Sequence, residues 1–140
     1  MFARPTIALL FALLALSPGA AAQDSKSLSC KFTSGVTHVY EKGVFLTEKA
    51  APLAFGIASI NTRAQTADLK TEHGTGTLRL VLAVNATHFI EVAVEGALYI
   101  TTVFDKDDDN GAYPAVHSRH LALLGQPLVT HYQGFCEATG

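Results

Sequence analysis

The sequence predicts an all-β domain, a small antiparallel meander that closes as a barrel of about eight strands. Three observations support this class. Short β-rich runs alternate with Gly, Pro, Asn and Asp, apolar and polar residues alternate within several runs, and no segment combines helical apolar spacing with helix caps. Closure would leave no free sheet edge. A two-sheet sandwich is the alternative architecture.

The expected strands follow one another between turn-forming residues. Gly-containing pairs, Pro52 and an acidic loop over 105–111 provide the clearest breaks, and the break between the first two runs is at Ser34-Gly35. The β-rich runs cover residues 28–33, 36–41, 44–48, 53–60, 66–71, 78–84, 88–95, 97–104, 114–124 and 128–136.

The alternation also predicts which faces are buried. Leucine and valine recur at every second position over 78–84, which predicts one core-facing side. In the run 88–95, Glu91 and Glu95 share a face with Phe89, and these carboxylates predict that this face points to solvent. We therefore expect the following residues to be buried: Leu80, Leu82, Ile90, Val92, Ile100 and Val116.

The N-terminal segment has the pattern of a secretory signal peptide. Arg4 gives a charged start, residues 7–16 form an unbroken apolar run, and residues 20–22 are small. The apolar run is too short to span a bilayer of about 30 Å. We expect a signal peptide over residues 1–22 with cleavage before Gln23.

The single β domain predicted over residues 23–140 is mildly acidic. The whole chain has 10 Lys+Arg, 12 Asp+Glu and a formal net charge of −2, and its basic residues are scattered. Nucleic-acid binding and attraction to anionic membrane surfaces both need clustered basic residues. We therefore expect no nucleic-acid partner and no membrane span after signal cleavage.

The two cysteines of the chain lie near the ends of the predicted domain. An even count in an exported chain predicts a Cys30–Cys136 disulfide. The spacing is not that of a redox CxxC motif. The pair is therefore interpreted as structural.

The best candidate for chemistry is the polar segment 117–120. On a strand, His117 and Arg119 share one face, whereas Ser118 and His120 share the other. Adjacent serine and histidine cannot pair locally, so we predict no catalytic residue. We predict instead that His117, Arg119 and His120 bind a ligand, with the Arg119 guanidinium holding a carboxylate or phosphate.

No metal or other cofactor is expected. The histidines lack zinc-site spacing such as HExxH. Asp105, Asp107 and Asp109 match the first three ligand positions of a calcium loop, but Asn110 and Val116 occupy its glycine and glutamate positions. A solvated turn is the preferred interpretation, with weak calcium binding as the alternative.

Four segments carry a resemblance to known proteins: HFIE at 88–91, LYITTVF at 98–104, AVHSRH at 115–120 and YQGFC at 132–136. With its terminal cysteine pattern, the chain resembles a group of small exported bacterial proteins with no assigned function. The resemblance implies a periplasmic or secreted location in bacteria. It implies no activity, ligand or catalytic residue.

Two functions are compatible with this sequence. The first is non-catalytic binding of a small apolar or amphipathic molecule inside a barrel of lipocalin-like size. The alternative is an interaction or inhibitor-like module that contacts a cell-envelope protein through its outer surface. An internal pocket favours the first, and a filled core beside an exposed aromatic patch favours the second.

Overall fold

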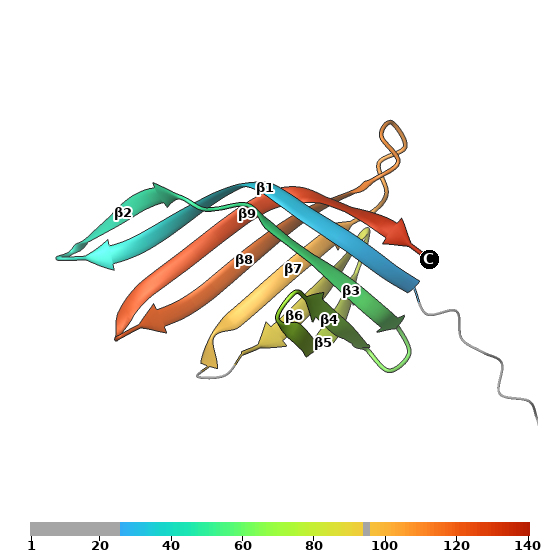
Figure 1. The fold of residues 1–140 in the computed structure, drawn as a ribbon, viewed down its shortest axis with the longest axis horizontal. Helices are drawn as coiled ribbons and strands as arrows, with labels where there is room; N and C mark the ends of the chain where they lie inside the picture. Colours follow the sequence, from blue (N-terminus) through green and yellow to red (C-terminus); the bar gives the residue numbers. More distant parts are fainter. Residues whose placement is uncertain (1–25, 94–95) are drawn as a thin grey trace, which may run out of the picture.

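Residues 26–93 and 96–140 are described by a computed structural model, in which they form nine β-strands (Figure 1). The predicted signal peptide, residues 1–22, lies outside the described residues. The strands are β1 (Lys26–Glu41), β2 (Val44–Lys49), β3 (Leu53–Asn61), β4 (Thr66–Thr71), β5 (Gly74–Ala83), β6 (Ala86–Val92), β7 (Leu98–Phe104), β8 (Tyr113–Leu123) and β9 (Gln126–Thr139).

Eight of these strands close into a barrel, which confirms the predicted fold class. The strands β3 to β9 pair in sequence order, and β1 pairs with both β3 and β9. Every pairing is antiparallel. The remaining strand, β2, pairs with the distal half of β1 and lies outside the closed ring.

The strand β1 is continuous where the sequence predicted two strands. It pairs with β9 along its length, and the predicted break at Ser34-Gly35 is a register shift between Phe32 and Ser34. Such a bulge bends a strand without ending it. Gly35 is required there because a Cβ atom would lie 2.5 Å from the ring of Tyr132.

One half of the barrel is filled. Phe32 and Ile57 are fully buried, together with the disulfide that joins Cys30 to Cys136. These cysteines are direct cross-strand partners on β1 and β9. The predicted disulfide is therefore confirmed, and it links the first and last strands of the barrel where the ring closes.

The prediction identified the correct core-facing side of β5. The buried part of that side is shorter than expected. Leu78 and Leu80 are buried, and Arg79 on the opposite face is exposed. Leu82 shares the inward face, yet it is 50% exposed compared with 3% for Leu80. It lies near the end of the strand, where the barrel interior meets solvent.

The predicted faces of β6 and β8 are wrong. Phe89 is buried inside the barrel, whereas Val92 and Val116 are exposed outside it. Ile90 and Ile100 are cross-strand partners on the outer side and are only half-buried. On β6 the prediction failed because it assigned the face that carries Glu91 to solvent, whereas Glu91 lines the cavity inside the barrel.

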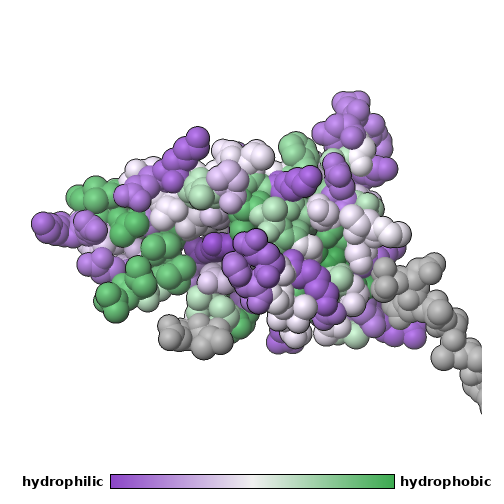
Figure 2. Space-filling view, viewed as in Figure 1, coloured by the Kyte–Doolittle hydropathy of each residue, from purple (hydrophilic) through white to green (hydrophobic). Residues whose placement is uncertain are grey.

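At the end of the barrel opposite Leu82, a sheet extends beyond the closed ring (Figure 1). We call this the projecting sheet: β2, the Val36–Glu41 part of β1, and the ends of β8 and β9 that meet at their shared turn. Apolar surface is gathered at this end of the molecule (Figure 2). Its exposed apolar residues are Val36, Tyr40, Val44, Phe45, Leu46, Leu123 and Leu124.

Candidate functional site

The half of the barrel nearer the projecting sheet contains a cavity of about 520 Å³. Aliphatic and aromatic side chains form one part of its wall, and polar side chains together with the β4–β5 turn form the rest. An apolar surface with convergent polar groups is typical of small-molecule sites. The apolar lining includes Leu53, Phe55, Leu69, Leu78, Phe89 and Tyr99. The polar lining within the barrel consists of Glu91, Thr101, His117 and Arg119.

Strand register places these polar groups in two neighbouring rows. Residues two apart on a strand share a face, and cross-strand partners lie side by side. The deeper row runs across four strands as Phe89, Thr101, His117 and Tyr132. The row nearer the open end runs as Glu91, Tyr99, Arg119 and Thr130.

His117 is the most deeply buried ionisable group of the site, at 5% exposed. Its ring lies among those of Phe55, Tyr132 and Phe32, with centroid separations of 5.2, 5.9 and 5.7 Å. Burial and, to a smaller extent, the positive charge of Arg119 together lower the pKa of His117 to about 4. The imidazole is therefore neutral at pH 7.

The hydrogen bonds of His117 determine its tautomer. Arg119 Nε lies 3.2 Å from His117 Nε2 and is always a donor, so Nε2 accepts. The proton of the neutral ring is then on Nδ1, which donates to Thr101 Oγ1 at 2.8 Å. Both ring nitrogens are occupied by partners that orient the imidazole.

This tautomer decides what His117 can do chemically. To activate the hydroxyl of Thr101, Nδ1 would have to accept its proton. Nδ1 already carries a proton as long as Arg119 donates to the other ring nitrogen. The arrangement therefore positions Arg119 and does not form a base–nucleophile pair.

Arg119 is held by aromatic rings on both neighbouring strands. Its guanidinium carbon lies 5.5 Å from the ring centroid of Tyr99 and 5.6 Å from that of Tyr132, within cation–π range. Among the described residues, its terminal nitrogens have no hydrogen-bond or ion-pair partner. These donors are free to bind an anionic group in the cavity.

Glu91 supplies a carboxylate to the same wall. Its row places it next to Tyr99, and burial raises its pKa while Arg119 opposes that rise. It forms no direct ion pair with Arg119. The cavity thus contains a guanidinium and a carboxyl group that is easier to protonate than an exposed glutamate.

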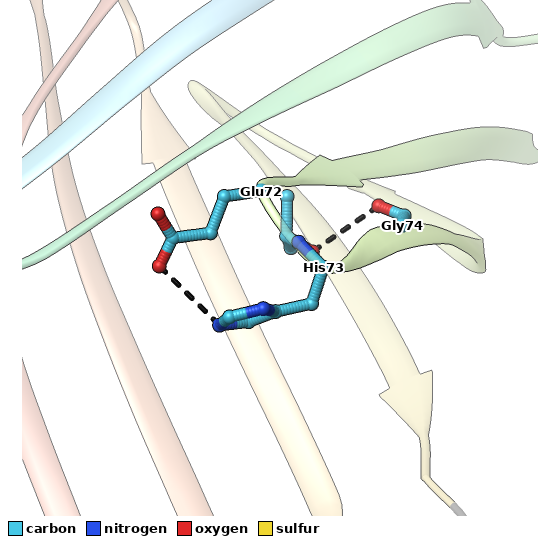
Figure 3. Close-up of polar contacts among 4 residues, drawn as sticks. Glu72, His73 and Gly74 are labelled. Carbon is cyan, nitrogen blue, oxygen red and sulfur yellow. Dashed lines mark hydrogen bonds and ion pairs between the residues drawn. The ribbon is translucent and has the colours of Figure 1, made fainter.

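The β4–β5 turn forms part of the cavity rim. The carboxylate of Glu72 lies 3.3 Å from His73 Nε2, and the two side chains extend toward one another from the turn (Figure 3). Thr71 Oγ1 donates to the carbonyl oxygen of Gly74 across the same turn. Both side chains at the rim are exposed, so their contact contributes little to stability.

The structure brings together two of the three predicted ligand-binding residues. His117 and Arg119 line the cavity, as their shared strand face predicts. His120 lies on the outer face, where its ring is 6.1 Å from that of His131, and His131 is 6.2 Å from His38. His120 therefore belongs to a different surface.

Sequence reasoning missed Glu91, Tyr99 and Thr101. Glu91 was assigned to solvent, Thr101 was treated only as a member of a β-rich run, and Tyr99 was one of several aromatics interpreted by default as core. The cross-strand register of β6, β7 and β8 would have identified these three residues. The antiparallel pairing of β6 with β7 places Glu91 beside Tyr99, and the inward Arg119 is the next residue across.

The acidic loop is held by hydrogen bonds of its own turn. Asp107 Oδ1 accepts a hydrogen bond from the backbone of Asp109, and the Asp107 carbonyl accepts one from Gly111. These are turn contacts. Within residues 26–93 and 96–140, no group of three or more His, Cys, Asp or Glu side chains, including Asp105, is arranged to hold a metal ion.

Comparison with models of protein families and with curated proteins finds no match for this chain. In the part of the chain that the structure describes, no helix is long and apolar enough to cross a membrane.

Proposed function

We propose that this protein binds one small amphipathic molecule, with its polar group at Arg119 and apolar carbons against the cavity wall. The observation that carries the proposal is the cavity of about 520 Å³, in which His117, Tyr99 and Tyr132 hold Arg119 and its terminal nitrogens have no partner among the described residues. Half-buried donors held in place in this way favour binding because little ordering is needed when the ligand arrives.

The chemistry of the cavity supports an anionic or strongly accepting head group. Arg119 is the only permanent cation among the residues that line the cavity. Its guanidinium can donate two parallel hydrogen bonds to a carboxylate or phosphate. The surrounding aliphatic and aromatic side chains match an alkyl or aromatic remainder.

Export to a bacterial periplasm or the exterior is part of the same proposal. The Cys30–Cys136 disulfide supports it, since disulfides persist mainly in oxidising compartments. A binding protein in such a compartment would meet a small molecule of the cell envelope or the medium.

The test uses dodecanoate as the probe and calorimetric titration as the measurement. Arg119→Met should weaken binding about tenfold or more, because a charge-assisted hydrogen bond contributes about 1.5–3 kcal/mol. Arg79→Met, at an exposed position on the outside of β5, is the matched control and should bind as wild type does. Equal affinities of all three proteins, with unchanged thermal unfolding, would contradict the proposal.

A second candidate function is supported by the outer side of the projecting sheet. Tyr40 and Phe45 are cross-strand partners whose rings lie 5.0 Å apart, and both are exposed. An exposed aromatic pair at a sheet end suits contact with a cell-envelope protein. A photo-crosslinking residue at Phe45 should then capture one defined partner in the producing cells, and the same residue at exposed Val81 should not.

A further inference from the structure

An aliphatic row crosses all four strands of the projecting sheet. Leu121 pairs with Leu128, Leu128 with Val39, and Val39 with Leu46. The first three are half-buried and Leu46 is 46% exposed. The row spans about 14 Å at the usual spacing of neighbouring strands. We call these four residues the aliphatic shelf.

The aliphatic shelf is continuous with the cavity. Leu121 follows Arg119 by two residues on β8 and therefore lies on the same inward face. The same step relates Leu128 to Thr130 and Val39 to Thr37, and these two threonines are cross-strand partners joined by a hydrogen bond. The shelf is thus the next row outward from the row that contains Arg119.

The charged side chains at the two ends of the aliphatic shelf have opposite signs. At the cavity end the shelf begins beside the guanidinium of Arg119. At the β2 end, exposed Glu48 flanks Leu46 on the same face and lies three strands from Arg119 in the row Arg119, Thr130, Thr37, Glu48. Exposed Glu41 lies on the outward side of Val39. An anionic head group is attracted to the first end and repelled from the second.

We propose that the ligand is a long-chain amphiphile whose anionic head lies at Arg119 and whose alkyl tail runs out along the aliphatic shelf. This inference rests on the proposed function and adds the ligand class and its orientation. The cavity takes the head and the first carbons, and the shelf covers one side of the remaining chain. The exposed Leu46 of the projecting sheet then has a defined occupant.

The test compares alkyl carboxylates of increasing length below their micelle-forming concentrations. A fully buried methylene gives about fourfold in affinity, and one covered on a single side gives about twofold. Affinity should therefore keep rising from hexanoate through decanoate to hexadecanoate. A tail enclosed within the cavity would instead stop gaining affinity once that volume is filled.

Two matched leucine variants locate the tail. Leu46 and Leu82 both lie on inward strand faces and are 46% and 50% exposed, but they are at opposite ends of the molecule. Leu46→Ser should weaken hexadecanoate binding about fivefold, equivalent to loss of two or so covered methylenes, and leave hexanoate unchanged. Leu82→Ser should change neither affinity.

The outcomes separate this inference from the function on which it rests. If hexanoate binds and Arg119→Met weakens it, but hexadecanoate binds no tighter than decanoate, the proposed function stands and the shelf proposal is overturned. Equal effects of Leu46→Ser and Leu82→Ser on hexadecanoate would also overturn it. If no alkyl carboxylate binds at any length, both proposals fail.

Discussion

The Nε2 atom of His117 accepts a hydrogen bond from Arg119 Nε, 3.2 Å away, within the wall of the cavity. This contact requires a neutral imidazole, because a protonated ring would present a second donor to the guanidinium. A buried histidine and the cation of the site are therefore linked. Acid should disturb the fold and the site through the same atom.

The first prediction concerns stability in acid. The pKa of His117 is about 4 in the folded protein and 6.5 when unperturbed. Between these values the unfolded chain binds a proton that the folded chain does not, so the free energy of unfolding falls as pH falls from 6.5 to 4. The total loss from this residue should be about 3 kcal/mol.

Urea unfolding at pH 7.5, 5.5 and 4 measures this effect. The pH-dependent part should be absent in His117→Gln, so the stability difference between wild type and this variant should shrink in acid. His73→Gln, which removes an exposed rim histidine, is the control and should follow wild type. A difference between wild type and His117→Gln that is constant over the whole range would show that His117 is not kept neutral by the fold.

The second prediction concerns Glu91. Its carboxyl group lies in the same cavity as Arg119, and an anionic ligand at Arg119 would add a like charge nearby. Glu91→Gln should tighten dodecanoate binding about fivefold, equivalent to about 1 kcal/mol of repulsion in a partly solvated site. Dodecanol, which has no charge, should bind the two proteins equally. Tighter binding of both probes would mean that the effect is not electrostatic.

The third prediction uses two leucines of one strand face. Leu80→Ala should cost about 2–5 kcal/mol of unfolding free energy, because it leaves a cavity in the filled half of the barrel. Leu82→Ala should cost under about 1 kcal/mol, because half of that side chain is already in water. Denaturant midpoints of the two variants test the depth of the core. Equal losses of unfolding free energy in the two variants would show that the packed interior does not end between Leu80 and Leu82.

The fourth prediction concerns processing and oxidation. The exported protein should begin at or near Gln23 and should change mass on reduction and alkylation by the amount expected for one disulfide. Cys30 and Cys136 are separated by 106 residues, so the closed loop stabilises the fold by about 4–5 kcal/mol in the chain-entropy model. The double variant Cys30→Ala/Cys136→Ala should lose most of this. Free thiols in the native exported protein would contradict the prediction.

The sequence predicts the barrel because its signals are local. Turn residues and period-two alternation determine where strands end and that they pair as hairpins. The disulfide was also predictable, since only two cysteines are present. What local patterns do not reveal is that β1 continues through Ser34-Gly35, because its pairing with β9 connects residues about a hundred positions apart.

The site was predictable only in part. His117 and Arg119 follow from alternation on one strand, and the structure places both at the cavity. Glu91 was assigned to solvent because an isolated carboxylate is costly to bury. Its nearest cation is on β8, two strands away in the sheet, and single-strand patterns contain no information about which strands become neighbours.

The proposed function requires the cavity to bind an amphipathic molecule with its polar group at Arg119. The most direct measurement is a titration of isotope-labelled protein with dodecanoate, followed by amide and side-chain NMR shifts. The account predicts saturable shifts at the Arg119 side chain, Thr101 and Gly76, all of which line the cavity. Absence of shifts at these residues, or shifts confined to exposed Phe45 and Val81, would contradict it.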